Sequence, residues 1–168
     1  SNISNEEFKN AFTMYLRKLI SFMFVKFIES PTVNAVKPYV FNFCIDTYYK
    51  NEIDCSTFQM PDDIKSRINA FSSSRITKAL LLLNSYLFDE SQKLIQGKSE
   101  IEHIFPQSWQ DTNYNGWSKA EAETHLNMLG NKIIFEKRLN IQAGNNYFGK
   151  KKDKYKESKI KEVQYLDR

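Results

Sequence analysis

The hydrophobic pattern of this chain changes at Gly97, and the change limits the folds that the chain can adopt. Before Gly97, apolar residues recur at steps of three or four, which is the period of amphipathic helices. After it, residues 99–105 alternate polar and apolar side chains, which indicates a half-buried strand. The pattern predicts an α+β, mostly helical fold, with a helical region at 1–96 and a second module at 97–168.

Four helices are expected in the first region. The first begins after Ser4, which Glu7 follows in the capping-box pattern, and it carries an aromatic stripe that we expect in the core. Two of the later helices begin near a proline, since proline is tolerated in the first turn of a helix. The expected helices cover residues 5–28, residues 38–50, a segment from Pro61, and residues 74–88.

The second module combines strands with short helices. A helix is expected after Ser118, which precedes Glu121 in a second capping-box pattern, and another strand is expected at 132–136. A basic helix is expected at 146–156. No long linker rich in Pro, Gly or Ser separates the two regions, so we expect them to form one compact unit.

Composition excludes several classes of protein. With 168 residues, the chain can bury a core without a disulfide or a structural zinc ion, and its two cysteines form no Cys-x-x-Cys pair. So few cysteines are typical of a reducing compartment, which predicts a cytoplasmic protein. The longest apolar stretch, residues 19–28, is shorter than the ~20 residues of a membrane span, so we expect a soluble protein without membrane contact.

Positive charge is concentrated in one stretch of the chain. Residues 137–161 contain nine Lys and Arg against two acidic residues, a net charge of +7 in a chain whose total is +4. Cations at this density, with aromatic residues between them, suit a polyphosphate such as nucleic acid, although a solvated Lys-rich helix face has the same pattern. The residues expected to bind nucleic acid are Lys132, Lys150, Lys151, Lys152, Lys154 and Tyr155.

One of the two histidines lies at the end of the first expected strand. This is His103, in the string Glu-His-Ile-Phe-Pro-Gln-Ser of residues 102–108. Taken alone, a histidine at a strand end is more often a structural residue than a catalytic one. A second string, Gly-Asn-Lys at residues 130–132, leads through the second expected strand to Asn140, nine residues after Asn131.

In combination, these strings resemble the HNH, or His-Me finger, endonucleases, whose motif is a two-stranded hairpin and a helix around one divalent metal. The first string is similar to the Asp-His-Ile-x-Pro-Gln-Ser segment of the HNH domain in RNA-guided CRISPR nucleases, and the spacing between the two asparagines is similar as well. A closer resemblance is to the C-terminal nuclease domain of Gmr-type, modification-dependent restriction enzymes. There, Glu-His-x-x-Pro precedes Gly-Asn, a strand, a further Asn, and Phe-x-x-Lys-x-x-x-Tyr-x-x-Ser. The last element corresponds to Phe148, Lys151, Tyr155 and Ser158, and the resemblance covers residues 99–160.

The resemblance implies a role for each matched residue. His103 would be the general base that takes a proton from water, and Asn131 would fix the loop and the orientation of His103. Mg²⁺ or Mn²⁺ would be held by Glu102 and the side-chain oxygen of Asn140, because a hard cation prefers oxygen ligands. Lys151 would contact phosphate.

The leading hypothesis is a metal-dependent DNA endonuclease, with a helical region packed on a ββα-metal module. The resemblance implies products with a 5′-phosphate and a 3′-hydroxyl, and a place in bacterial restriction of foreign or modified DNA. It also implies an N-terminal nucleotide-hydrolysing domain or partner subunit outside this chain, because no Gly-rich phosphate loop occurs here. Two alternatives stay open: a nucleic-acid-binding module with a degenerate HNH site, and a helical interaction domain built on residues 5–90.

Overall fold

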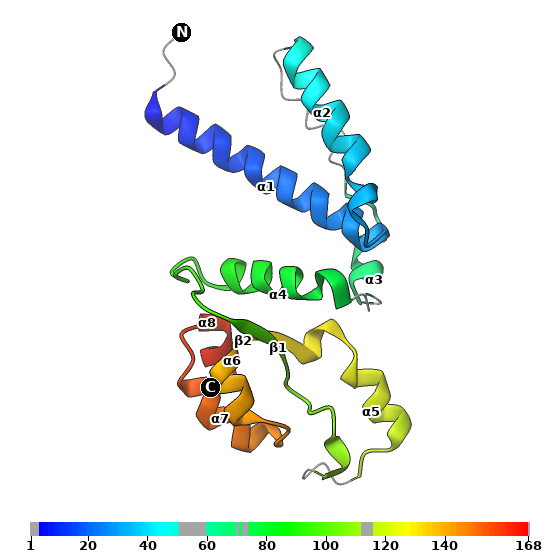
Figure 1. The fold of residues 1–168 in the computed structure, drawn as a ribbon, viewed down its shortest axis with the longest axis vertical. Helices are drawn as coiled ribbons and strands as arrows, with labels where there is room; N and C mark the ends of the chain where they lie inside the picture. The colour runs from blue at the N-terminus through cyan, green and yellow to red at the C-terminus, as the bar shows by residue number, and fades with distance from the viewer. Residues whose placement is uncertain (1–3, 51–59, 70, 72–73, 112–115, 168) are drawn as a thin grey trace. The chain divides into compact units, whose positions relative to one another are not determined.

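The computed structural model describes residues 4–50, 60–69, 71, 74–111 and 116–167. Backbone contacts divide the chain into two compact units, Ser1–Asn69 and Ala70–Arg168, and each is described by itself (Figure 1). The architecture is α+β and mostly helical, as predicted, and the described residues include a two-stranded antiparallel sheet. Among these residues, no helix is both long and apolar enough to cross a membrane.

The N-terminal unit is helical in its described residues. Its first helix starts as predicted, because the Ser4 hydroxyl accepts a hydrogen bond from the Glu7 amide at 3.2 Å and the Glu7 carboxylate accepts one from the Ser4 amide at 2.9 Å. The elements of this unit are α1 (Asn5–Glu29), the 3₁₀ turn η1 (Val33–Ala35), α2 (Lys37–Lys50) and α3 (Ile64–Asn69).

The aromatic stripe of α1 is only partly buried. Phe22 is 3% exposed and meets the ring of Tyr39 edge-on, with ring centroids 5.5 Å apart. At the other end of the helix, Phe8 and Phe12 are 59% and 49% exposed. The expectation that the whole stripe is core is therefore wrong, because the buried residues of α1 lie in its C-terminal half.

The second unit is built around two strands, β1 (Ser99–His103) and β2 (Lys132–Glu136). They are antiparallel, and their register pairs Ser99 with Glu136 and His103 with Lys132. His103 and Glu136 therefore lie at opposite ends of the sheet. The helices of this unit are α4 (Ser74–Phe88), α5 (Lys119–Leu126), α6 (Lys137–Ala143), α7 (Phe148–Lys156) and α8 (Lys161–Tyr165), and its 3₁₀ turns are η2 (Trp109–Asp111) and η3 (Leu129–Asn131).

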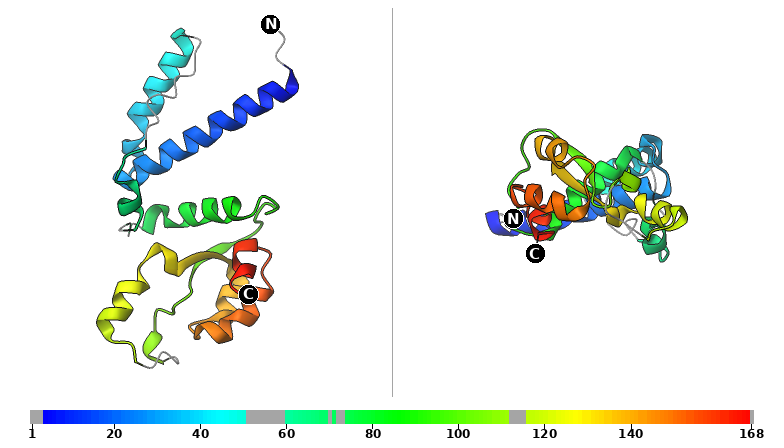
Figure 2. Two further views of the ribbon diagram at one scale, coloured as in Figure 1. Left: turned by 180° about the vertical axis from the view of Figure 1, so that it is seen from behind. Right: turned by 90° about the horizontal axis from the view of Figure 1, so that it is seen from below.

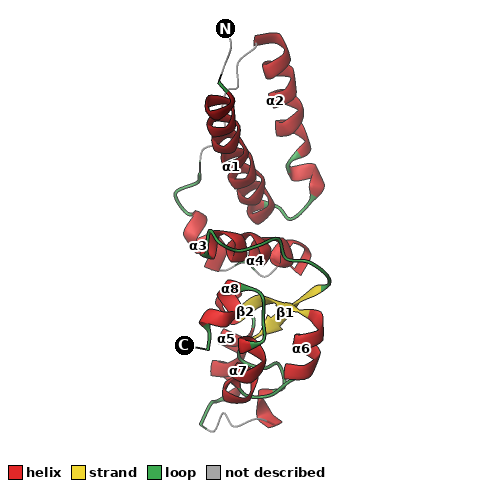
Figure 3. Ribbon diagram, turned by 90° about the vertical axis from the view of Figure 1, so that its left-hand side faces the viewer, coloured by secondary structure: helices red, strands yellow, loops and turns green. Residues whose placement is uncertain are grey.

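Both faces of β2 are covered. The strands lie between α4 on one side and α6 and α7 on the other (Figure 2 and Figure 3). Leu81 of α4 and Tyr155 of α7 belong to the same core as β2. A strand that is buried on both faces is apolar at successive positions, and Ile133, Ile134 and Phe135 are each at most 2% exposed.

Three features of the second unit differ from the sequence-based prediction. First, α4 packs against β2, so the division of the chain places it with the strands and not with the helices before it. Second, α6 is absent from the prediction; it starts directly after β2 and ends at Gly144, whose φ of 56° suits a glycine after a helix. Third, α8 is also absent from the prediction, and α7 begins at Phe148 rather than at residue 146.

Candidate active site

Glu102 and His103 are neighbours at the end of β1 and differ in their surroundings. Adjacent residues of a strand point to opposite faces of the sheet. Glu102 is only 4% exposed, whereas His103 is half-buried. The two side chains therefore meet different groups, although their backbones are joined.

The Glu102 carboxylate is held by two residues of α7. Its Oε1 atom lies 2.7 Å from Nζ of Lys151 and accepts a hydrogen bond of 2.9 Å from the Tyr155 hydroxyl. Lys151 and Tyr155 are one helical turn apart, so they share a face of α7, and they are 1% and 0% exposed. Buried charges are tolerated when they are paired and hydrogen-bonded, and both conditions are met here.

Lys151 also reaches the backbone at His103. Its Nζ atom donates a hydrogen bond of 2.6 Å to the carbonyl oxygen of His103. One buried ammonium group thus joins α7 to the carboxylate of Glu102 and to the main chain of the next residue. The effect is to fix the backbone from which the His103 imidazole projects.

The electrostatic surroundings of His103 favour its neutral form. Burial is the main cause that lowers the pKa of its imidazole below the ordinary value of 6.5, and the positive charges of Lys132 and Lys151 lower it further. A neutral imidazole at neutral pH can accept a proton, which is what a general base requires.

Asn131 braces the segment that follows His103. Its Oδ1 atom accepts a hydrogen bond of 2.6 Å from the Phe105 amide, and its Nδ2 atom donates bonds of 3.1 Å to the carbonyl oxygens of Phe105 and Leu126. Its own carbonyl oxygen accepts a 2.9 Å bond from the Ile104 amide. The Asn131 side chain thereby ties the segment after β1 to the end of α5.

Sequence reasoning missed a second asparagine that braces the same region. Asn145, which follows α6, accepts a hydrogen bond from the Ser108 amide at 3.0 Å and donates one to the Ser108 carbonyl oxygen at 2.8 Å. Ser108 is the last residue of the string that begins at Glu102. An asparagine directly after the Ala-Gly end of a helix was the available signal, because asparagine side chains often bond neighbouring backbone in turns.

The two predicted metal ligands, Glu102 and Asn140, have different partners in the structure. Asn140 is half-buried on α6 and lies near Glu100, whose carboxyl pKa is lowered mainly by Lys137 and also by Asn140. Glu102, two residues along the strand, is bonded to Lys151 and Tyr155. Within the described ranges, no three His, Cys, Asp or Glu side chains form a group able to hold a metal ion.

Comparison with known protein families identifies the family of the chain. The family model described as GmrSD restriction endonucleases, C-terminal domain, matches residues 60–167. The chain belongs to this family. Comparisons with curated proteins and with solved structures gave no match. Membership of the GmrSD family supports a nuclease of the restriction type, with DNA as its substrate.

For a GmrSD domain that acts on DNA, the exposure of its basic residues becomes important. Lys151 and Tyr155 are buried, so the prediction that they contact nucleic acid needs correction: in this conformation their side chains do not reach the surface. Lys150 is exposed, and Lys152 and Lys154 are partly exposed.

The other predicted DNA contacts of this GmrSD domain also have partners within the chain. Lys132 donates a 3.0 Å hydrogen bond to the carbonyl oxygen of Asn127, and Lys154 forms an ion pair of 2.5 Å with Glu157. Lys152 lies 3.8 Å from the Asp167 carboxylate. Contact with DNA by these lysines stays a prediction.

Proposed function

We propose that this chain is an HNH-type DNA endonuclease in which His103 is the general base, and that it serves restriction of foreign or modified DNA. The proposal rests on the surroundings of the His103 side chain and on the support of its backbone. Its imidazole is half-buried with a lowered pKa, and its backbone is held by Lys151. A rigidly placed neutral imidazole is suited to accept a proton from water.

In the proposed reaction, His103 takes a proton from a water molecule as the water oxygen attacks the phosphorus of the DNA backbone. The bond between phosphorus and the 3′-oxygen breaks, and the 3′-oxygen leaves and takes up a proton from solvent. The products are a 5′-phosphate and a 3′-hydroxyl. The charge of Lys132, which is close enough to lower the pKa of His103, favours the approach of the anionic phosphate to the same place.

The requirement for Mg²⁺ or Mn²⁺ rests on the resemblance to HNH nucleases. Glu102 does not fit as a metal ligand in its present arrangement, because the Oε1 atom of its buried carboxylate already binds the Lys151 ammonium and the Tyr155 hydroxyl. A divalent cation on this carboxylate would lie close to a buried positive charge. We therefore assign Glu102 to holding Lys151.

The proposal includes a partner outside this chain, a nucleotide-hydrolysing domain or subunit. It rests on the resemblance to Gmr-type enzymes and on the family description of the matched segment as a C-terminal domain. Cleavage by the isolated chain is then expected to be slow and to rise when such a partner is added.

The two histidines of the chain allow a matched test of the proposal. Nicking of supercoiled plasmid would be followed for wild type, His103→Ala and His125→Ala. His125 lies exposed in the last turn of α5, with its ring 5.4 Å from that of Trp117, and serves as the control. We expect cleavage to be lost in His103→Ala and retained in His125→Ala. Wild-type cleavage by His103→Ala would overturn the assignment of the base.

A second candidate function is a nucleic-acid-binding module without chemistry. The observation that favours it is the Glu102–Lys151 pair, which occupies the place where the HNH motif has its acidic metal ligand. Its signature would be DNA binding with a steep salt dependence and no nicking with either Mg²⁺ or Mn²⁺.

A further inference from the structure

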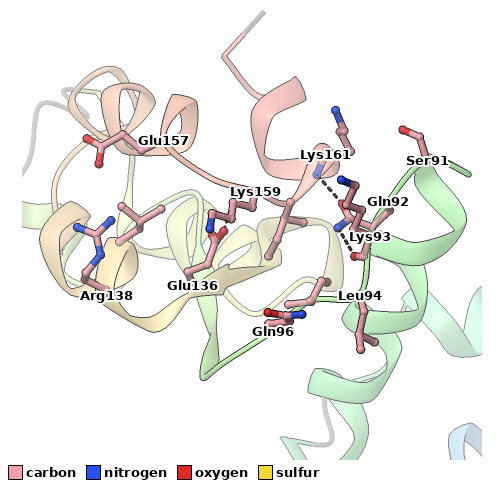
Figure 4. Close-up of a pocket in the computed structure, with 13 residues that line it drawn as sticks. Ser91, Gln92, Lys93, Leu94, Gln96, Glu136, Arg138, Glu157, Lys159 and Lys161 are labelled. Atoms are coloured by element: carbon pink, nitrogen blue, oxygen red, sulfur yellow. Dashed lines mark hydrogen bonds between the residues drawn. The ribbon is translucent and has the colours of Figure 1, made fainter.

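The second unit contains a pocket that none of the predicted site residues line (Figure 4). Its volume is about 790 Å³, and it is formed by residues 91–96 after α4, by the junction of β2 and α6, and by residues 157–161 between α7 and α8. It lies at the Glu136 end of β2, whereas Lys132 at the other end pairs with His103. Four steps along the strand, each of ~3.3 Å, separate the two ends by about 13 Å.

The cations of this pocket are exposed. Lys93, Arg138 and Lys159 line it, and among the described residues none of the three forms an ion pair. In Figure 4, Arg138 lies on one side of the pocket and Lys93 on the other, with Lys159 between them. A fourth cation, Lys161, also lines the pocket. Hydrogen bonds from Ser91 are the main cause that lowers the pKa of the nearby Asp89 carboxyl, and Lys161 adds a smaller contribution.

The two acidic residues of the pocket are already bonded. The Glu136 carboxylate accepts a hydrogen bond of 2.8 Å from the Ser158 hydroxyl and one of 2.7 Å from the Lys159 amide. Glu157 is paired with Lys154, which lies outside the pocket. Glu136 keeps its negative charge, because both of its donors are neutral groups. The pocket lining therefore holds four cations against two carboxylates, one of which is paired with a lysine outside the pocket.

The walls of the pocket are held in place by the fold. Leu139 and Ile160 are 3% and 1% exposed and belong to the core beneath the pocket. The Lys161 amide donates a 2.7 Å hydrogen bond to Oε1 of Gln92, which ties the segment after α4 to the start of α8. Arg138 lies on α6, whereas Lys93 and Lys159 lie on the connections that follow α4 and α7, and this hydrogen bond and the core residues hold those connections beside the helix.

We propose that this pocket binds phosphate groups of the DNA backbone at a distance from the cleaved bond. The inference rests on the proposed function, which makes DNA the substrate. Phosphates of one strand follow each other every ~3.4 Å along the duplex axis, so the ~13 Å between the ends of β2 corresponds to about four nucleotides. A duplex whose axis runs along β2 therefore covers the distance from the His103 end of the sheet to the pocket in about four base pairs.

Binding of a labelled DNA duplex, measured by fluorescence anisotropy over a range of salt, tests this site. The variant is Lys93→Ala/Arg138→Ala/Lys159→Ala in the full chain. The control is Lys9→Ala/Arg17→Ala/Lys18→Ala, which removes the same charge from exposed positions of α1. Loss of three phosphate contacts should lower the slope of log K against log salt by about 2 to 3 and weaken binding by roughly one to two orders of magnitude at ~0.1 M salt. The control should bind like wild type.

Three results would separate this site from its alternatives. If the pocket variant binds DNA with the affinity and salt slope of wild type, the proposal is overturned. Calorimetric binding of AMP that is lost in the pocket variant, with DNA affinity unchanged, would also overturn it and indicate a site for free phosphate esters. A failure of the proposed function would give a different result. In that case His103→Ala would still cleave DNA, while the pocket variant would still bind DNA more weakly than wild type.

Discussion

The side-chain nitrogen of Lys151 donates a hydrogen bond of 2.6 Å to the main-chain oxygen of His103. The same nitrogen lies 2.7 Å from the carboxylate of Glu102. A buried lysine of α7 therefore controls the position of the proposed base without lying on the surface. Changes at Lys151 should act on stability and cleavage together, and their effect on DNA affinity should be small.

Replacement of Lys151 by methionine should destabilise the protein strongly. It would leave the Glu102 carboxylate buried without its cation, a change that typically costs about 3–5 kcal/mol. Urea unfolding would measure the loss, and Lys150→Met is the matched control, because Lys150 is exposed and should change stability by no more than about 0.5 kcal/mol. Equal stability of the two variants would contradict the pairing of Lys151 with Glu102.

Removal of both charges should cost much less than removal of one. In the double variant Glu102→Gln/Lys151→Met, no unpaired ion stays buried, so most of the stability lost in Lys151→Met should return. A double-mutant cycle with Glu102→Gln measures the coupling. Additive effects of the two single changes would show that the residues act independently.

Much of the secondary structure of the second unit can be predicted from local sequence, but the Glu102–Lys151 ion pair cannot. The Ser118 capping box and the strand at 132–136 are found where the pattern predicts them, because both depend on neighbouring residues. Burial of Lys151 depends on Glu102, far away in the chain, and lysines in a basic helix are normally solvated. A signal was nevertheless present, since Phe148, Lys151 and Tyr155 recur at helical spacing and so share one face.

The pH dependence of cleavage should report the lowered pKa of His103. Cleavage is expected to fall as His103 becomes protonated, with half of the activity lost at a pH below the ordinary histidine value of about 6.5. Lys132→Ala removes a nearby positive charge, so this midpoint should move to higher pH. A midpoint above 6.5 in the wild type, or no movement in the variant, would contradict the described environment of His103.

The lowered pKa of His103 also predicts how the stability of the fold varies with pH. Because the pKa of His103 is lower in the folded state, the unfolded chain takes up a proton first as the pH falls. The contribution of His103 to stability should thus be fully present above about pH 6.5 and decline towards its lower folded-state pKa. Urea unfolding of wild type and His103→Gln across this range would show it. Parallel curves for the two proteins would contradict it.

Removal of divalent metal tests the proposed requirement for Mg²⁺ or Mn²⁺, which rests on the resemblance to HNH nucleases. Chelation should abolish plasmid nicking, and Mg²⁺ or Mn²⁺ should restore it. Because Glu102 is assigned to holding Lys151, the metal concentration for half-maximal cleavage should be the same in Tyr155→Phe as in wild type, although Tyr155→Phe loses a hydrogen bond to Glu102. A large rise in that concentration would indicate that Glu102 is a metal ligand.

Chemical rescue of a histidine variant tests whether the imidazole of His103 is the general base. His103→Gly should lose nicking activity, and added imidazole should restore part of it, with a rate that rises as the free imidazole becomes neutral. His125→Gly should cleave like wild type and be unaffected by imidazole. Undiminished cleavage by His103→Gly in the absence of imidazole would contradict the role of His103 as the base.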